Sequence, residues 1–331
     1  MKIESDQKLD FNNVLIRPKR STINSRSEVD MTRTFKFPNA IEKCNNSKGY
    51  EKKQWNGVPI ISANMDTTGT FEVYDVLSKH KIITALNKFY TLEHYQEAIK
   101  SRKLDPDYFM VSTGITENNF NDMSKIVKET GCNWICVDIA NGYINKFVEF
   151  CRKVRDNFPD KIIVAGNIAT REMVEELILN GKVDIVKVGI GPGSACLTRL
   201  KTGVGMPQLS AIIECSDAAH GMNGYIISDG GITCPGDMAK AFGGGADFVM
   251  VGGQFAGHDE NPGELIVDEN GDKYKLFYGM SSQHAMEKHY GKMEKYRSSE
   301  GRKIQVKYKG SLENTVLDYL GGIRSTCTYI N

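Results

Sequence analysis

The stretch from Asp184 to Gln208 carries residue types that together could perform covalent catalysis. It begins as an apolar strand at Asp184–Val188 and then presents Cys196, with the hydroxyl of Thr198 two residues further on. A thiol nucleophile beside a proton-relay partner is what covalent catalysis requires. Glycines at alternate positions precede the cysteine and leave one side of the backbone bare, so a flat ligand can approach it closely. These glycines are Gly189, Gly191 and Gly193.

The relative placement of Cys196 and Thr198 depends on the local backbone. If the chain stays extended past the glycines, side chains two apart point the same way and the thiol lies beside the hydroxyl. The alternative is a glycine-rich turn around an inert cysteine, because free cysteines are usually core residues. A dinucleotide-binding turn is rejected, since Pro192 interrupts the glycines and no helix begins directly after them. The pattern GxxxxGK followed by Ser or Thr does not occur, which excludes a P-loop.

Eight short apolar runs, rich in Ile and Val, follow one another from residue 58 onward and are typical of strands buried on both faces of a parallel sheet. They lie at Val58–Ala63, Lys81–Leu86, Tyr108–Ser112, Trp134–Ile139, Lys161–Ala165, Asp184–Val188, Tyr225–Ser228 and Asp247–Val251. Predicted helices between them lie at Thr70–His80, Thr91–Lys103, Glu117–Thr130, Ile144–Asn157, Arg171–Asn180, Pro207–Ala219 and Pro235–Phe242. This alternation predicts an α/β fold, a (β/α)8 TIM barrel. A doubly wound sheet is disfavoured, because it usually has about five or six strands.

The other segments are predicted to surround this barrel within a single domain of residues 1–331. Residues 1–55 are polar and are expected to be irregular, wrapping around the barrel as an N-terminal extension. Residues 260–305 break the rhythm, with a hairpin predicted at Asn270 and Gly271 and a helix and charged loop after it. This insertion lies between the eighth strand and a last helix at Leu312–Leu320, so it can form a lid over the C-terminal face.

Active sites of such barrels lie where the strands end. Polar or glycine residues fall at seven of the predicted strand ends: Asn64 to Asp66, Asn87 and Lys88, Asp138, Asn167, Cys196, Asp229, and Gly252 with Gly253. The loops after the seventh and eighth strands carry the glycine pairs Gly230–Gly231 and Gly252–Gly253, which favour a phosphate cradle of backbone amides. Asp229 can accept hydrogen bonds from ribose hydroxyls.

The composition excludes several classes of protein. A net charge of +1 provides no bulk field for nucleic acid or a membrane surface. No apolar run approaches the ~20 residues that span a bilayer, and the polar N-terminus lacks the apolar core of a secretory signal. The eight cysteines include no CxxC pair and are interpreted as reduced thiols rather than a zinc site. We therefore expect a cytoplasmic protein without a nucleic-acid or membrane partner.

Ordered blocks over nearly the whole chain resemble one enzyme family. The run GPGSACLTRLKTGVGMPQ at Gly191–Gln208 is similar to the active-site loop of the IMP dehydrogenase/GMP reductase family, and its Arg199–Gly205 part resembles the GMP reductase version. The other matching blocks are SRSEVD at Ser25–Asp30, ANMDT at Ala63–Thr67, VDIANGY at Val137–Tyr143, ISDGG at Ile227–Gly231, FYGMSS at Phe277–Ser282, YRSSEG at Tyr296–Gly301 and GGIRSTCTY at Gly321–Tyr329.

The resemblance implies NADPH-dependent reductive deamination of GMP to IMP and ammonia, in purine salvage. The Cys196 thiolate would attack C2 of the purine and form a covalent thioimidate, which hydride transfer from NADPH would resolve. A soft nucleophile of this kind splits one hard displacement into two easier steps. The leaving amine needs a proton, which Thr198 with Glu300 could relay.

The resemblance also implies the ligand-binding residues. GMP would contact Asp229, Gly230, Gly231, Gly252, Gly253, Gly279, Met280, Ser281, Arg297, Ser298, Ser299, Glu300 and Gly301. NADPH would contact Ser25, Arg26, Lys88, Asp138, Ile139, Ala140, Ile190, Gly191, Met280, Tyr296, Arg297 and, from a neighbouring subunit of a homotetramer, Ser325, Thr326, Cys327 and Thr328. A monovalent cation such as K⁺ would be bound at Gly191, Gly193, Cys196 and Arg199.

Two other functions compete with this one. An IMP dehydrogenase would use the same cysteine but hydrolyse the intermediate, and it usually carries regulatory modules between early strands. The spacing from Lys88 to Tyr108 leaves room for one helix and no such insertion. A catalytically inactive purine-nucleotide-binding barrel is the second alternative. If turnover of GMP depends on Cys196, the protein is an enzyme and not an inactive nucleotide-binding barrel.

Overall fold

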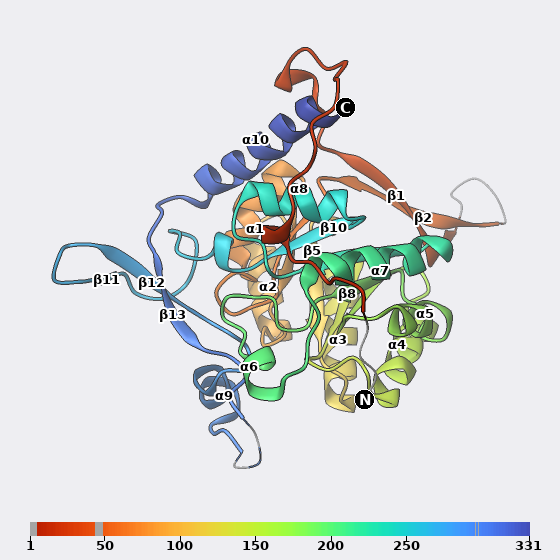
Figure 1. Cartoon of the computed structure of the whole chain (residues 1–331). Coiled ribbons are helices and arrows are strands. Elements are labelled where there is room, and N and C mark those ends of the chain that lie inside the picture. Colours follow the sequence, from red (N-terminus) through yellow and green to blue (C-terminus); the bar gives the residue numbers. More distant parts are fainter. Residues whose placement is uncertain (1–4, 44–48, 295, 297) are drawn as a thin grey trace.

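Eight parallel strands close into a barrel at the centre of the molecule (Figure 1). The computed structural model describes residues 5–43, 49–294, 296 and 298–331. The barrel strands pair in chain order, and the last closes onto the first. They are β3 (Ile60–Ser62), β4 (Ile83–Leu86), β5 (Phe109–Thr113), β6 (Trp134–Asp138), β7 (Ile162–Ile168), β8 (Ile185–Val188), β9 (Tyr225–Asp229) and β10 (Phe248–Val251).

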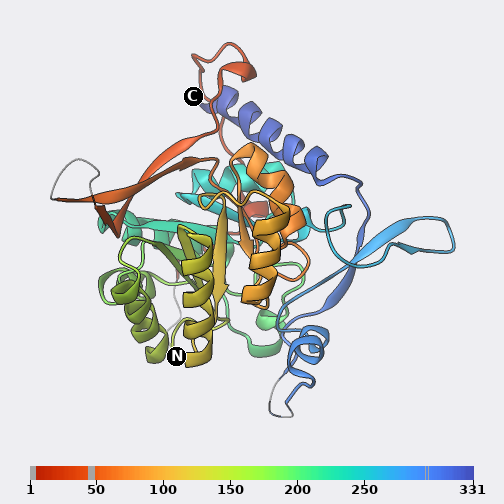
Figure 2. The same cartoon turned by 180° about the vertical axis from the view of Figure 1, so that it is seen from behind.

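Helices connect successive strands and cover the outside of the barrel (Figures 1 and 2). They are α1 (Phe71–Leu77), extended by a 3-10 turn at Ser78–His80, α2 (Leu92–Ser101), α3 (Glu117–Thr130), α4 (Asn145–Asn157), α5 (Arg171–Leu179), α6 (Thr198–Thr202), α7 (Gln208–Gly221) and α8 (Pro235–Gly243). The predicted (β/α)8 TIM barrel is therefore confirmed. All eight strands lie within one to three residues of their predicted bounds, because buried parallel strands have an unambiguous apolar pattern.

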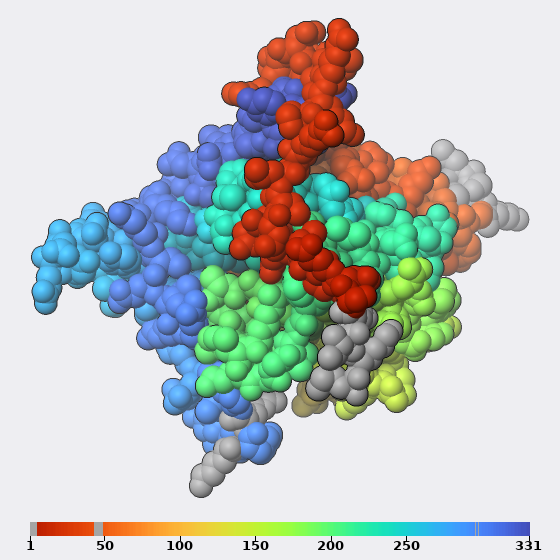
Figure 3. Space-filling view, in the orientation of Figure 1, coloured from red at the N-terminus to blue at the C-terminus, as the bar shows by residue number. Residues whose placement is uncertain are grey.

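The N-terminal segment runs along the outside of the barrel and, contrary to the expectation, it is not irregular throughout. Its first part, with a 3-10 turn at Phe11–Asn13, runs over α7 and α8 (Figure 3). The Leu9 amide donates to the Ser210 hydroxyl at 2.7 Å, and Lys240 donates to the Phe11 carbonyl at 2.8 Å. A second 3-10 turn lies at Arg26–Glu28.

An antiparallel hairpin that the sequence analysis did not predict closes the N-terminal end of the barrel. It consists of β1 (Arg33–Lys43) and β2 (Tyr50–Gly57). Phe35 stacks on Phe248 at 4.4 Å between ring centroids, and Trp55 meets Trp134 edge to face at 5.4 Å. Trp134 and Phe248 are the first residues of β6 and β10. Aromatic pairs in these geometries stabilise beyond their buried area, so the hairpin acts as an aromatic plug.

The insertion after β10 forms a small antiparallel sheet and a helix beside the opposite end of the barrel (Figure 2). A 3-10 turn at Gly253–Phe255 leads into β11 (Ile266–Val267) and β12 (Lys273–Tyr278), which form the predicted hairpin. The helix α9 (Gln283–Tyr290) and the unpredicted strand β13 (Lys303–Lys307) follow, and β13 pairs with β12. The last helix, α10, extends over Leu312–Ile330, ten residues beyond its predicted end. We call residues 260–305 the lid.

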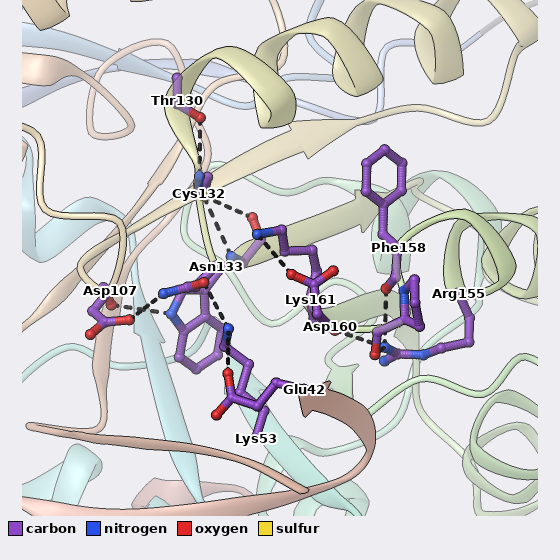
Figure 4. Close-up of polar contacts among 12 residues, drawn as sticks. Glu42, Lys53, Asp107, Thr130, Cys132, Asn133, Arg155, Phe158, Asp160 and Lys161 are labelled. Carbon is purple, nitrogen blue, oxygen red and sulfur yellow. Dashed lines mark hydrogen bonds and ion pairs between the residues drawn. The ribbon is translucent and has the colours of Figure 1, made fainter. Parts of the chain in front are cut away.

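Buried polar groups fasten the loops at the plugged end (Figure 4). Lys53 donates to the Asn133 side chain at 2.8 Å. Arg155 is 7 % exposed, and its guanidinium donates to the carbonyls of Phe158 and Lys161. It also forms a 2.5 Å ion pair with Asp184, which is fully buried. One cation thereby satisfies several buried carbonyls and balances the charge of a buried carboxylate whose other partners are backbone amides. Within the described ranges, none of the helices has the length and apolarity needed to cross a membrane.

We predict that Arg155→Met destabilises the fold by about 3–5 kcal/mol, because it leaves Asp184 as a buried, uncompensated charge. Urea unfolding followed by circular dichroism measures this loss. Arg152→Met is the matched control on the same helix. Its side chain is 49 % exposed and pairs with Asp156, so the free energy of unfolding should change by less than about 0.5 kcal/mol. Equal effects of the two substitutions would contradict the assignment.

Candidate active site

The predicted catalytic residues meet at the C-terminal end of the barrel strands. The Cys196 thiol donates to the Thr198 hydroxyl at 3.3 Å, and that hydroxyl donates to the Glu300 carboxylate at 2.7 Å. Cys196 is partly exposed. A continuous path for a proton therefore runs from sulfur to carboxylate, and its far end lies 102 residues away in sequence from Thr198.

The reason given for the Cys196–Thr198 contact is wrong, although the contact exists. The backbone is not extended here, because Leu197 adopts φ −117° and ψ 5° and Thr198 is the first residue of α6. The Cys196 amide donates to the Gly193 carbonyl at 3.0 Å and closes a turn. A turn followed by the start of a helix, and not an extended strand, brings the Cys196 and Thr198 side chains together.

The lid backbone holds Glu300 against the cysteine loop. Cys196 and Gly301 form an antiparallel bridge, and the Arg302 amide donates to the Ala195 carbonyl at 2.9 Å. A Cβ atom on Gly301 would lie 2.7 Å from the Ser282 nitrogen, and one on Gly279 would lie 2.9 Å from the Ala195 carbonyl oxygen. The three chain segments therefore touch backbone to backbone, and glycine is required at the crossing.

Both predicted glycine pairs lie next to the cysteine loop. Gly230 has φ +90°, and a Cβ atom there would lie 3.0 Å from Pro192. Gly231 has φ +81°. A Cβ atom on Gly253 would lie 3.3 Å from the Ser194 hydroxyl. Gly252 precedes it at the end of β10 and lies against Met65 and Phe277. Backbone amides in such left-handed and close-packed turns can face an anion, so the residue types and the placement fit a phosphate.

A buried lysine that the sequence analysis overlooked connects two of the predicted ligand-binding carboxylates. Lys187, on β8, forms ion pairs with Asp138 at 2.7 Å and with Asp229 at 3.0 Å. Asn167 also donates to Asp229, at 2.8 Å. Burial raises the pKa of Asp138, but the charges of Lys187 and Lys88 outweigh it and hold that pKa below its usual value. The sequence feature that could have indicated this buried ion pair is the charged residue Lys187 inside an otherwise apolar strand.

A cluster around Asp66 anchors the lid to the barrel. Asp66 accepts hydrogen bonds from His289 at 2.6 Å, from the Tyr278 hydroxyl at 2.9 Å and from Lys288 at 3.0 Å. His289 also stacks on Phe89 with ring centroids 3.4 Å apart. Burial raises the pKa of Asp66, but the hydrogen bonds from His289 and Lys288 outweigh it and lower that pKa overall. We call these four hydrogen-bonded residues the Asp66 cluster.

Other predicted ligand-binding residues lie around this mouth. The Met280 sulfur accepts from the Asp66 amide at 3.4 Å, and the Ser299 hydroxyl donates to the Gly301 carbonyl at 2.9 Å. Ile190 is buried, whereas Tyr296 is 83 % exposed. The remaining members occupy the same loops: Ile139 and Ala140 after β6, Gly191 before the cysteine, and Ser281 and Ser298 in the lid. Arg297 lies outside the described residues.

Two groups of predicted cofactor residues lie elsewhere on the same chain. Ser25 and Arg26 are exposed at the second 3-10 turn. Ser325, Thr326, Cys327 and Thr328 lie on α10. Figure 1 shows the N-terminal segment and the end of α10 together, away from α6, and the Lys19 amide donates to the Tyr329 carbonyl at 2.8 Å. These two groups of predicted cofactor residues therefore lie in one patch, which is separate from the cysteine loop of the same chain.

The predicted cation site is only partly compatible with its side chains. Gly193 and Cys196 offer carbonyls in the turn, as carbonyl ligation of a monovalent cation requires. Arg199, however, directs its guanidinium to the carbonyls of Ile190 at 3.1 Å and Met206 at 2.5 Å. A guanidinium has no lone pair to offer, so only the backbone of Arg199 could contribute to such a site.

We predict that Asp66→Asn loosens the lid without unfolding the barrel, because its charge-assisted hydrogen bonds are worth about 1.5–3 kcal/mol each. Amide hydrogen exchange over α9 should accelerate by about tenfold or more, while the barrel strands remain protected. Lys292→Met, at a solvated lid position whose ion pair is with Glu294, is the control and should leave exchange over α9 unchanged. Unaltered exchange in Asp66→Asn would mean that the lid is held by other contacts.

Comparison with known proteins agrees with the geometry. The model of the IMP dehydrogenase / GMP reductase domain matches residues 8–331. The chain is 55 % identical over 330 residues to mouse GMP reductase 1, covering 99 % of this chain and 92 % of that protein. It is 55 % identical over 329 residues to human GMP reductase 2, covering 99 % and 91 % respectively.

The similarity extends to bacteria, since the chain is 54 % identical over 334 residues to GMP reductase of Aeromonas salmonicida (strain A449), covering 100 % of this chain and 92 % of that protein. A domain match of this length, together with relatives that are similar from end to end, identifies the family without reference to the site. The chain belongs to the IMP dehydrogenase/GMP reductase family.

Proposed function

We propose that this protein is a GMP reductase, an NADPH-dependent oxidoreductase that converts GMP to IMP and ammonia in purine salvage. The observation that carries the proposal is the hydrogen-bonded chain from Cys196 through Thr198 to Glu300. It lies beside two glycine pairs suited to a phosphate and a carboxylate suited to a ribose. Relatives named GMP reductase, similar over nearly the whole chain, support the same conclusion.

The first chemical step follows from the direction of these hydrogen bonds. The Cys196 thiol gives its proton to Glu300 through the Thr198 hydroxyl, and the sulfur adds to C2 of the guanine ring. Glu300 returns the proton through Thr198 to the exocyclic amine, which leaves as ammonia. The product of this step is a thioimidate between Cys196 and the purine. Because one relay removes and returns the same proton, no other acid is required for departure of the amine.

The second step releases the product. NADPH, when bound, supplies a hydride to C2. The Cys196 sulfur is then expelled as a thiolate and IMP leaves. Gly301 of the lid pairs with Cys196, and this contact would help to exclude water that would otherwise hydrolyse the intermediate. This exclusion distinguishes a reductase from a dehydrogenase of the same family.

Substrate placement assigns one task to each loop. Asp229 accepts from the ribose, and the pairs Gly230–Gly231 and Gly252–Gly253 bind the phosphate through their amides. The lid residues would cover the base: Gly279, Met280, Ser281, Ser298, Ser299, Glu300 and Gly301, with Arg297, which lies outside the described residues, as a further expected contact. Their contacts with the cysteine loop support this arrangement, because Gly279 and Gly301 both pack against its backbone.

The cofactor would approach from the side of Asp138 and Lys88. The placement of Ser25, Arg26 and Ser325–Thr328 on one patch supports their use by an adjoining subunit, in a homotetramer. A monovalent cation such as K⁺ would be held by carbonyls of Gly191, Gly193, Cys196 and Arg199, and it would stabilise the turn that carries the thiol. The described cysteines are free, in keeping with a reducing compartment such as the cytoplasm.

We predict that Cys196→Ala abolishes turnover of GMP, with a loss of up to about a millionfold, while GMP still binds. Glu300→Gln should lower kcat by about 10²–10⁴ because the leaving amine loses its acid. NADPH oxidation followed at 340 nm, with parallel calorimetry of GMP binding, measures both effects. Cys234→Ser is the control, because Cys234 is exposed at the start of α8, and it should keep full activity. Full activity of Cys196→Ala would exclude covalent catalysis.

We also predict which pair of ligands reacts. Purified protein should oxidise NADPH and release ammonia only when GMP is present. With IMP and NAD⁺ it should reduce the dinucleotide far more slowly, because the lid contact at Cys196 would withhold water from the intermediate. Mass spectrometry of protein quenched during turnover should find a purine adduct on Cys196. Faster reaction of IMP with NAD⁺ would assign the chain to dehydrogenase chemistry, and binding of GMP without turnover would support an inactive barrel.

A further inference from the structure

A lysine lies inside the barrel where an apolar residue would be expected. Lys187 is 2 % exposed and stands between Val186 and Val188 on β8, both of which are fully buried. Side chains alternate between the two faces of a strand, so Lys187 faces the barrel interior while the two valines face the surrounding helices. An ammonium buried in such surroundings is expensive unless its charge is matched.

Two carboxylates from other strands provide the match. Asp138 ends β6 and binds the ammonium at 2.7 Å, and Asp229 ends β9 and binds it at 3.0 Å. β9 is the immediate neighbour of β8, whereas β6 lies two strands away on the other side. Lys187 therefore reaches across the barrel interior and joins positions that no hydrogen-bonded strand pair connects. Burial alone lowers the pKa of Lys187, but the two carboxylates raise it above its usual value, so the lysine remains charged.

The contacts of Asp229 are arranged asymmetrically. Its Oδ2 atom accepts from Lys187 at 3.0 Å and from the Asn167 side-chain amide at 2.8 Å. Asn167 is itself held, because it also donates to the Gly189 carbonyl at 2.8 Å. No hydrogen bond to Oδ1 is present among the described residues, and the Asp229 side chain is 20 % exposed. Two donors on one oxygen fix the plane of the carboxylate and leave its second oxygen for a ligand.

We propose that Lys187 is a positioning residue that aligns Asp229 for the ribose hydroxyls of the nucleotide and Asp138 for the dinucleotide. The inference rests on the proposed function, because it takes the ligand-binding tasks of those two aspartates from it. Lys187 touches neither ligand. It acts by holding two like charges within hydrogen-bond distance of a common cation, an arrangement that the carboxylates could not keep by themselves.

The physical basis is the repulsion that Lys187 cancels. Without the ammonium, two partly buried carboxylates would face each other, with Lys88 as the remaining cation that acts on Asp138. Neighbouring like charges either turn apart or share a proton. Both outcomes misdirect Oδ1 of Asp229, and sub-ångström placement of a ligand-binding group controls its contribution. The binding of both ligands should therefore weaken together.

The test is Lys187→Met, which keeps most of the length of the side chain and removes its charge. Calorimetry would compare the affinity for GMP with that for 2′,3′-dideoxy-GMP, and quenching of intrinsic fluorescence would measure the affinity for NADPH. The wild-type protein should prefer GMP by about tenfold to a hundredfold, as expected when hydrogen bonds to a carboxylate are lost. The variant should bind both nucleotides about equally and bind NADPH about tenfold more weakly. Retained sugar discrimination in the variant would overturn the inference.

Controls separate positioning from stability. Lys53→Met removes another buried lysine, 7 % exposed, at the plugged end of the barrel, and should leave sugar discrimination intact even if the protein melts at a lower temperature. If Lys187→Met does not fold, Lys187→Met with Asp138→Asn removes the repulsion and should fold with its sugar discrimination restored, while NADPH binding stays weak because the charge of Asp138 is lost. Loss of discrimination in that double variant would show that repulsion from Asp138 is not what misplaces Asp229, and it would also overturn the inference. Failure of the wild-type protein to bind GMP would instead reject the proposed function.

Discussion

The contact on which the site depends is the backbone crossing between the cysteine loop and the lid. Cys196 and Gly301 form an isolated antiparallel β-bridge. This bridge places the Glu300 carboxylate 2.7 Å from the Thr198 hydroxyl. The crossing is possible only because Gly279 and Gly301 lack side chains. Without this crossing, the Thr198 hydroxyl would still lie next to the Cys196 thiol, but it would have no carboxylate to receive the proton. The proton relay is therefore a property of two segments held together and not of the cysteine motif alone.

The two ends of the barrel have different physical characters that suit this arrangement. The N-terminal end is filled by aromatic rings of the β1–β2 hairpin and by ion pairs with buried partners. The C-terminal end is built from glycine turns, exposed loops and a lid attached through the Asp66 cluster. Packing at one end can fix the strand positions while the loops at the other end adapt to a ligand. At the mouth, Asp138 and Asp229 are held by strand ends, whereas Cys196 and Glu300 are carried by loops.

The barrel was predictable from sequence because each buried strand is a short apolar run, and parallel strands repeat that pattern eight times. The β1–β2 hairpin was missed because its inward residues, Phe35, Phe37 and Trp55, alternate with charged ones, and the basic side chains made the segment look like a solvated loop. β13 was missed for a similar reason, since KIQVK is short and half exposed. In both cases the strand exists because a partner strand covers it, which a single local pattern does not reveal.

The site was predictable in its parts but not in its connections. Cys196 and Thr198 are close in sequence, so their contact could be anticipated even with the wrong backbone geometry. Glu300 and Lys187 acquire meaning only through partners far along the chain. Lys187 was counted as part of an apolar strand, although a lone charge buried on both sides must have a counter-charge. That requirement can be stated from sequence, but the identity of its partners, Asp138 and Asp229, depends on the closure of the barrel. The same closure makes one cation serve two ligand-binding carboxylates, so the coupling between them arises from the fold and not from any motif.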